Sequence, residues 1–424
     1  MEARLTEAVK ATPDGEEAAS ILRNCVHCGF CLATCPTYQL LGDELDGPRG
    51  RIYLIKQVLE GDTPTASTQL HLDRCLTCRA CETTCPSGVQ FGRLLDTGRR
   101  LVDEQVRRPK LQRLARGLLA ALLTGPWFAP ALWMSRALRP LLPRALASRV
   151  PSRAMAGHWP TRRHSRRMLL LTGCVQPAMA PNINASTARV LDALGIELLV
   201  AREAGCCGAI RHHLTNQQGA LDDARRNIDA WWPHIKAGAE AIIFNASGCG
   251  TMLREYGHLL RNDPVYADKA ARISALSRDL AELLPPYAVQ LAAMLRAPVT
   301  RRISFHAPCS LQHGLKVRGA VEKLLLVLGA EILPVADGHL CCGSAGTYSL
   351  LQSRIAEQLG QARAQALMAP GPEVILSANI GCIAHITTGA SVPVRHWIEW
   401  VDERLNPPAA ARVHTEPIPN TIVR

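Results

Sequence analysis

Apolar and polar residues alternate in two copies of one pattern after Arg167. Short apolar runs occur in MLLLTG, IELLVA and AIIFNASG of the first copy, and in ISFHAP, EILPVA and VILSANIG of the second. The longer segments between them have the helical period. Continuous apolar runs separated by amphipathic helices predict parallel βαβ units whose sheets are covered on both faces. The pattern therefore predicts two repeated, doubly wound α/β domains.

The same pattern gives the expected domain boundaries. We expect the first α/β repeat over residues 167–262 and the second over 301–405, joined by a helical linker over 263–300. A tail over 406–424 follows. Ahead of the repeats, residues 1–100 carry two cysteine runs and residues 101–166 form a basic, apolar connector.

The connector contains an uncharged stretch over residues 117–134. Its length approaches that of a membrane-spanning helix, but Gly125, Pro126 and Pro130 interrupt it. We expect two short apolar helices that dock on a partner or lie at a membrane surface; covering the protein's own core is the alternative. The flanking cations are Arg113, Arg116, Arg136 and Arg139.

The cysteine runs CVHCGFCLATCP and CLTCRACETTCP share the spacing C-x2-C-x2-C-x3-C-P. This spacing holds cubane [4Fe–4S] clusters, and the fourth cysteine of each run ligates the other cluster. Zinc also uses C-x2-C pairs but has no use for two identical runs that each end in Cys-Pro. We expect a mainly helical ferredoxin-type domain with two [4Fe–4S] clusters. Cluster 1 would take Cys25, Cys28, Cys31 and Cys85, and cluster 2 would take Cys75, Cys78, Cys81 and Cys35.

Between the two runs, GPRGRIYLIKQVLEGD reads as a helix opened by Pro48. Arg49 and Arg51 lie in its first turn. Cations beside a cluster favour its reduced state, although surface ion pairs are an equally good interpretation of these arginines.

Each α/β repeat carries four cysteines in matching order. Thirty-one residues separate Cys174 from Cys206 and also Cys309 from Cys341. The first and last cysteine of each repeat follow predicted strands, at the sheet edge where parallel folds bind ligands. We expect these sets as further iron–sulfur ligands: Cys174, Cys206, Cys207 and Cys249, and Cys309, Cys341, Cys342 and Cys382.

Adjacent cysteines are poor structural disulfides. Neighbouring Cα atoms are ~3.8 Å apart, whereas an unstrained disulfide needs ~4.4–6.8 Å. Gly205, Gly208 and Gly343 allow backbone angles that turn both sulfurs to one side. A shared metal cluster is the preferred interpretation, and a thiol–disulfide redox pair is the alternative.

Charge and composition limit the possible partners and the cellular compartment. Lys and Arg exceed Asp and Glu by 48 to 36, a net charge of +12 that suits nucleic acid, an anionic membrane or an acidic protein. The first residues do not read as a secretory signal, so we expect a cytoplasmic protein. Sixteen cysteines in that reducing compartment indicate metal or redox chemistry.

These motifs resemble a known family. The repeats resemble the cysteine-rich, or CCG, domain of heterodisulfide reductase B subunits, and with the ferredoxin-type domain the chain resembles the iron–sulfur subunits of glycolate oxidase. The resemblance covers nearly the whole chain. It is carried by CVHCGFCLATCPTY, GPRGRIYLIK, CLTCRACETTCPSGV, GCCGA, HLCCGSAGTYSL, NIGCIAHI and PVRHWIEWVDE.

The resemblance implies an oxidoreductase complex in which a partner flavoprotein with FAD oxidises glycolate, and D-lactate as a further substrate. This chain would relay single electrons from the flavin toward the quinone pool, peripherally on the cytoplasmic face of the inner membrane. It has no G-x-G-x-x-G between a strand and a helix, so no flavin site of its own is expected.

The chain departs from the full CCG motif, which ends in C-x-x-C. Met252 and His385 stand at the last position, which leaves the presence of clusters in the repeats open. His385 is a candidate iron ligand or a packing residue. His306, His313 and His339 are candidates to handle protons if a quinone is reduced there.

Three alternatives stay open. The iron–sulfur subunit of anaerobic glycerol-3-phosphate dehydrogenase and a heterodisulfide-reductase-like thiol enzyme resemble this architecture. A nucleic-acid-binding iron–sulfur protein would suit the charge, but a structural cluster needs only one four-cysteine set and the basic zone lacks interleaved aromatics. We therefore expect no nucleic-acid partner.

Overall fold

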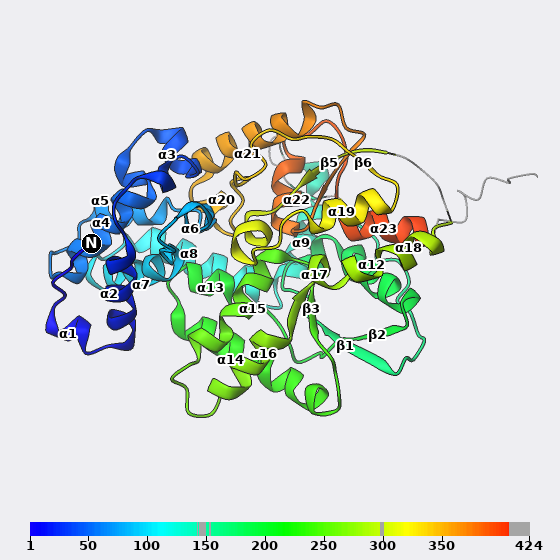
Figure 1. Cartoon of the computed structure of the whole chain (residues 1–424), viewed down its shortest axis with the longest axis horizontal. Helices are drawn as coiled ribbons and strands as arrows, with labels where there is room; N and C mark the ends of the chain where they lie inside the picture. The colour runs from blue at the N-terminus through cyan, green and yellow to red at the C-terminus, as the bar shows by residue number, and fades with distance from the viewer. Residues whose placement is uncertain (142, 144–149, 152–153, 297–300, 407–424) are drawn as a thin grey trace, which may run out of the picture.

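The computed structural model describes residues 1–141, 143, 150–151, 154–296 and 301–406. The predicted tail over 406–424 thus lies almost entirely outside the described residues. Figure 1 shows the helical N-terminal part in blue at one end of the molecule, with the first repeat in green and the second in yellow and orange beside it.

The N-terminal part is a bundle of short helices, as predicted. Proline occupies the first position of three of them, at Pro13, Pro36 and Pro48, where its missing N–H is not needed. Its elements are α1 (Glu7–Lys10), α2 (Pro13–Asn24), η1 (Phe30–Leu32), α3 (Pro36–Leu41), η2 (Glu44–Asp46), α4 (Pro48–Leu59), α5 (Ala66–Asp73), α6 (Ala80–Thr84) and α7 (Phe91–Gln105). The last helix continues past the expected boundary at residue 100.

The connector forms two helices, α8 (Lys110–Thr124) and α9 (Phe128–Ala137), followed by η3 (Arg139–Leu141). They meet at 94° across the predicted break. Pro130 does not break α9, because it lies in the first turn, where no intrahelical N–H is required. In the described part of the chain no single helix is long and apolar enough to cross a membrane. Only α8 and α9 taken together have that length and apolarity, and they form a bent pair.

The two repeats have the predicted parallel sheets and share one topology. The sheet orders are β2-β1-β3-β4 and β6-β5-β7-β8, and all pairs of neighbouring strands are parallel. The first comprises β1 (Arg166–Leu170), α11 (Gln176–Met179), α12 (Pro181–Ala193), β2 (Ile196–Leu199), α13 (Ala209–His213), α14 (Gln217–Lys236), β3 (Ile242–Phe244), α15 (Ser247–Leu259), α16 (Ala267–Leu276), β4 (Ser277–Asp279), α17 (Leu280–Leu283), η4 (Pro285–Tyr287) and α18 (Ala288–Met294). The second comprises β5 (Arg302–His306), η5 (Ser310–Gly314), α19 (Ala320–Val327), β6 (Glu331–Ile332), α20 (Tyr348–Leu351), α21 (Ser353–Met368), β7 (Val374–Ser377), α22 (Ile380–Thr387), β8 (Val394–His396) and α23 (Trp397–Leu405).

The structure differs from the prediction at the linker. Residues 263–300 do not simply connect the repeats, because they contribute β4, which pairs with β3 through Ile242 and Ser277. Ser277 and Asp279 are buried in that strand. A three-residue polar strand has no apolar run by which the sequence pattern would reveal it, so the first repeat extends further than expected.

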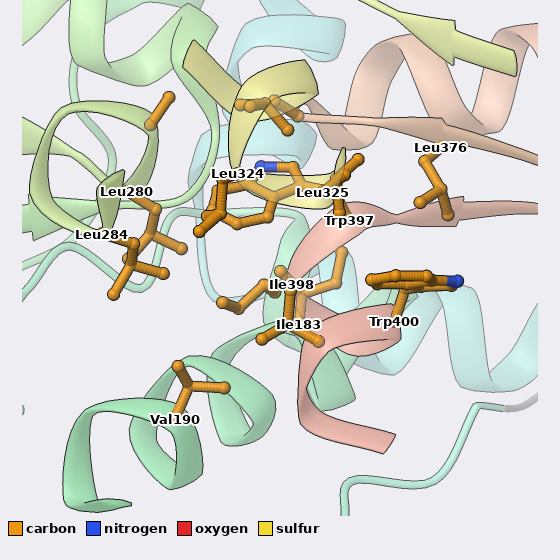
Figure 2. Close-up of a cluster of buried hydrophobic side chains, with 14 of the residues drawn as sticks. Ile183, Val190, Leu280, Leu284, Leu324, Leu325, Leu376, Trp397, Ile398 and Trp400 are labelled. Carbon is orange, nitrogen blue, oxygen red and sulfur yellow. The ribbon is translucent and has the colours of Figure 1, made fainter. Parts of the chain in front are cut away.

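The two repeats share one hydrophobic core. Figure 2 shows Leu324 and Leu325 of α19, Trp397 and Ile398 of α23 and Leu280 of α17 in a single cluster. The buried guanidinium of Arg189 on α12 donates its Nε–H to both Asp402 oxygens on α23, at 3.0 and 2.9 Å. Because α23 packs on α12, the end of the second repeat is held against the first.

Candidate functional site

The first cysteine run places three thiols around one hollow. Cys25 ends α2, Cys31 lies in η1, and Cys28 lies between them. His27 and Gly29 have φ of 59° and 85°, and these left-handed residues turn the loop so that its cysteines line the hollow together. Cys85, which ends α6, completes the lining from the other run.

The second run repeats this geometry. Thr77 and Arg79 have φ of 53° and 59°, at positions equivalent to His27 and Gly29. Cys75, Cys78 and Cys81 line a second hollow, and the fourth lining cysteine is Cys35 from the first run. Cys81 borders both hollows. Each hollow therefore brings together the four cysteines that the spacing rule groups.

The wide spacing of the cysteine thiols in both hollows suits a cluster better than a single metal ion. Four thiolates around one zinc lie ~3.8 Å apart, the edge of a tetrahedron with ~2.3 Å bonds. Among the described residues, no three of these eight thiols lie within 4.8 Å of one another. The donor set, four cysteines around a hollow, is that of a [4Fe–4S] cube.

Cations line both hollows and are also ion-paired. Arg49 borders the first hollow and donates to Glu44 at 2.6 Å; Arg51 borders the second and is fully buried. Asp46, equally buried, lies 3.4 Å from Arg51 and 2.8 Å from Arg74. Both arginines are thus ion-paired, at the surface for Arg49 and in the interior for Arg51, while their effect on a cluster stays a prediction. The sequence did not mark Asp46 as their buried counter-ion.

Burial favours the protonated form of three of these thiols. It raises the pKa of Cys31 to about 11, and raises the pKa of Cys78 and Cys81 well above the usual range. A bound iron centre would displace those protons, because thiolates are the ligating form.

In each α/β repeat the four cysteines meet at the carboxyl edge of the sheet. Cys309 Sγ lies 3.6 Å from Cys341 Sγ, and the Asn379 amide donates to Cys382 Sγ at 3.4 Å. In the first repeat, Cys174 and Cys206 share a hydrogen bond that raises the pKa of Cys174 and lowers that of Cys206. The structure thus brings each predicted set together. We call the region around the set of the first repeat the first crevice, and that of the second repeat the second crevice.

The glycine after each cysteine pair is required by the backbone. Gly208 and Gly343 have φ of 90° and 84°, and a Cβ would lie 2.9 Å from the Ala220 carbonyl oxygen and 2.8 Å from that of Ala356. Their N–H groups donate to the first sulfur of each pair at 3.4 Å. The CCG turn therefore aims a backbone donor at the sulfur of the first cysteine.

Met252 and His385, which stand at the last position of the motif, both make packing contacts. Met252 is buried in the core of the first repeat. His385 Nε2 lies 2.9 Å from the Ala356 carbonyl, and in the described part of the chain His385 belongs to no group with metal-ligand spacing. The packing interpretation of His385 fits this geometry.

The three candidate proton-handling histidines have different surroundings. His306 is fully buried and lies with Cys342 and Cys382 so that their ligand atoms fall within 4.8 Å of one another. His313 lies between two partners, Thr83 Oγ1 at 3.0 Å and the His339 carbonyl at 2.9 Å. His313 therefore connects the second repeat to the ferredoxin-type domain.

Two family models match the chain. A 4Fe–4S dicluster domain matches residues 21–89, and a cysteine-rich domain matches residues 168–254 and 303–387. These matches coincide with the two hollows and the two cysteine crevices, and confirm the predicted domain classes.

Relatives match over most of the chain. It is 53% identical over 407 residues to the glycolate oxidase iron–sulfur subunit of Escherichia coli (strain K12), covering 96% of this chain and 99% of that protein. It is 30% identical to the probable glycolate oxidase iron–sulfur subunit of Bacillus subtilis (strain 168), covering 87% and 89%. Lactate utilization protein A of Exiguobacterium sp. is 26% identical over 55% of this chain. On these matches, and on the cysteine sets that carry them, the chain belongs to the family of glycolate oxidase iron–sulfur subunits.

Proposed function

We propose that this chain is the electron-transferring subunit of a glycolate-oxidising complex, with its two [4Fe–4S] clusters held by the two exchanged cysteine sets. The observation that carries the proposal is the lining of the hollows: Cys85 lies with the first run and Cys35 with the second. Iron–sulfur clusters supply one-electron redox chemistry. The chain's own residues would ligate the clusters, set the charge around them and bring their sites close together, with Cys81 bordering both.

A flavoprotein partner is the second part of the proposal. Substrate oxidation is assigned to FAD on that partner, with D-lactate as a further substrate, in keeping with relatives named for lactate utilization. The first hollow is the site where the partner would dock, since Cys28 is exposed and the neighbouring Val26 and Phe30 expose 68% and 62% of their surface. Exposed apolar side chains around a ligating thiol suit a transient protein contact.

A peripheral contact with the cytoplasmic face of the inner membrane is the third part. The helices α8 and α9 bury only Ala120 and Leu132, so they do not serve mainly to cover the protein's core. Their exposed apolar side chains are Leu111, Leu114, Leu118, Leu122, Trp127, Trp133 and Met134. Apolar residues with tryptophans on a strongly basic chain are typical of helices that lie in a membrane interface. Such a contact would place the chain near the quinone pool, the proposed acceptor.

The test is an assay of the complex with glycolate, D-lactate and glycerol 3-phosphate, using a quinone analogue as acceptor. We expect reduction of the quinone with glycolate. Activity with glycerol 3-phosphate alone would replace the proposal by the dehydrogenase alternative. Reduction of a disulfide substrate would favour the heterodisulfide-reductase-like enzyme, and strongly salt-dependent binding to duplex DNA would favour a nucleic-acid-binding protein.

A further inference from the structure

The two cysteine crevices differ in one buried residue. When the repeats are aligned on Cys174 and Cys309, Leu171 of the first repeat corresponds to His306 of the second. Both side chains are buried, with exposed fractions of 3% and 0%. An apolar wall in one crevice is therefore replaced by an imidazole in the other.

The hydrogen bonding of His306 fixes the position of its proton. Arg363 Nε lies 3.2 Å from His306 Nδ1. Because a guanidinium only donates, Nδ1 accepts and the ring proton is on Nε2. Nε2 is buried and has no hydrogen-bond partner among the described residues. A ring nitrogen of His306 lies within 4.8 Å of the sulfurs of Cys342 and Cys382, so a metal centre on these cysteines would lie next to this unpaired N–H.

Arg363 adds a buried positive charge beside this crevice. It is 3% exposed, and its Nη1 donates to the carbonyls of Ala336 and Asp337 at 3.1 and 2.9 Å. Its Nη2 has no hydrogen-bond partner among the described residues. Burial lowers the pKa of Arg363, and the groups that raise this pKa against burial are the thiols of Cys342, Cys341 and Cys382 and the carboxylate of Asp337. A buried cation is strongly unfavourable unless negative charge lies nearby.

The first crevice lacks this charge. Its nearby cations, Arg211 and Arg226, are both paired with the carboxylate of Asp223. Arg363 has no such bonded carboxylate among the described residues, so thiolates around a metal centre in the second crevice would add negative charge beside it, together with Asp337.

The second crevice also adjoins the ferredoxin-type domain. Cys78 and Cys309 both pack on one small apolar cluster that contains Leu76 and Cys341. Tyr348, in the same cluster, donates its hydroxyl to the Arg74 carbonyl at 3.0 Å. The second hollow and the second crevice thus share a packed boundary.

The first repeat meets the ferredoxin-type domain differently. Its contacts there include ion pairs from Glu255 to Arg79 and Arg93, at 2.9 and 3.3 Å. The core that holds Cys207 and Cys249 includes no described residue of the ferredoxin-type domain. Only the second repeat, in the described part of the chain, packs its cysteines against those of that domain.

We propose that the second repeat is the electron acceptor of the ferredoxin-type domain, with an iron–sulfur centre on Cys309, Cys341, Cys342 and Cys382 whose reduced state Arg363 and His306 stabilise. The first repeat lies outside this path. The inference rests on the proposed relay function. In the step, the cluster on the second hollow loses one electron and the centre on the second repeat gains it, with no bond formed or broken. His306 and Arg363 act as positioning residues, through an N–H donor and a charge.

The first experiment locates the centre, using the full chain purified anaerobically with its native iron and reduced by dithionite. Iron, acid-labile sulfide and EPR spectra are compared for wild type, Cys341→Ala and the matched Cys206→Ala. We expect Cys341→Ala to lose iron and an EPR signal that Cys206→Ala retains, while both keep the two cubane signals. No loss in Cys341→Ala, or an equal loss of that signal in both variants, would overturn the proposal.

The second experiment tests the positioning residues by a redox titration of that EPR signal. His306→Leu installs the residue of the first repeat, and Arg363→Met removes the charge. Each should move the midpoint potential of this signal to a more negative value, changing the equilibrium constant for electron exchange by about tenfold, the worth of one charge-assisted hydrogen bond. Arg363→Lys keeps the charge and should shift the midpoint potential less than Arg363→Met does. Arg211→Met should leave the midpoint potential of this signal unchanged.

A signal whose potential is unchanged in both His306→Leu and Arg363→Met would exclude their role. Retention of the cubane signals shows that each variant has folded, so a misfolded protein is not mistaken for a negative result. Because dithionite replaces the flavoprotein, these measurements do not depend on the substrate. Failure of the glycolate assay and failure of this inference are therefore distinguishable.

Discussion

His212 Nε2 on α13 of the first repeat lies 3.1 Å from Asp96 Oδ2 on α7 of the ferredoxin-type domain. Burial lowers the pKa of His212, but the carboxylate of Asp96 outweighs it and the net pKa is raised. Burial raises the pKa of Asp96, and the adjacent His212 outweighs that effect, so its pKa is held well below the usual range. The pair is a charged link between two domains.

This link predicts a pH-dependent stability. The contribution of His212 is complete below its unfolded pKa of about 6.5 and is lost as pH rises through its raised folded value; that of Asp96 is complete above about 3.9 and is lost as pH falls through its lowered folded value. His212→Gln should therefore destabilise most between about pH 4 and 6.5, by about 1–3 kcal/mol. Thermal unfolding across pH checks this.

The matched control is His158→Gln, at an exposed position. It should lower the melting temperature little and equally at every pH. A His212→Gln deficit that stays constant from pH 5 to beyond the raised pKa of His212 would contradict the charged link.

The exchange of the fourth cysteines makes a prediction about which variants share a phenotype. Cys85→Ala should remove the same EPR signal as Cys28→Ala, although 56 residues separate the two in the chain. Cys35→Ala should instead remove the same EPR signal as Cys78→Ala. Each variant should lose about four irons, the content of one cube. If Cys85→Ala affected the signal that Cys78→Ala removes, each run would hold its own cluster.

Asp46 predicts a stability effect beside the second hollow. It is fully buried and lies near three donors, on Arg51, Arg74 and His71. Asp46→Asn leaves two arginines without their counter-ion and should destabilise the domain by about 3–5 kcal/mol. Thermal unfolding with parallel measurement of iron release checks this.

The control for Asp46→Asn is Glu44→Gln, which breaks the ion pair with Arg49. The side chains of Glu44 and Arg49 are 42% and 34% exposed, so the loss of folding stability should be only about 0–1 kcal/mol. Equal effects of the two variants would show that burial does not set the strength of these ion pairs.

The elements predicted from the sequence are those with strong apolar runs. The strand predicted around Ile303 and the helix around Leu324 are found as β5 and α19, because a doubly covered sheet requires continuous apolar side chains. The strands β4 and β8, Ser277–Asp279 and Val394–His396, were not predicted. Each has only three residues, all polar or charged in β4 and two of the three in β8, so neither has an apolar run that would reveal it.

The candidate site was predictable where cysteine spacing specifies it. The replacement of Leu171 by His306 was also readable in the aligned repeats, since each lies three positions before the first cysteine of its repeat. The role of Arg363 was not, because an arginine on an amphipathic helix usually faces water. The packing of α21 on β5 places it beside His306.

The exposed apolar face of the connector makes the final prediction. Leu111, Leu114 and Leu118 recur at helical spacing on α8 and expose 81%, 58% and 60% of their surface. If this face lies in the membrane interface, replacing all three by Gln should lower binding to vesicles that contain anionic phospholipid by more than about tenfold, since each buried leucine contributes ~1.5–3 kcal/mol. Leu326→Gln with Val327→Gln, on the exposed face of α19, is the matched control and should bind as wild type does. Unchanged vesicle binding in the triple variant, together with loss of the flavoprotein from the purified complex, would instead assign this face to the partner subunit.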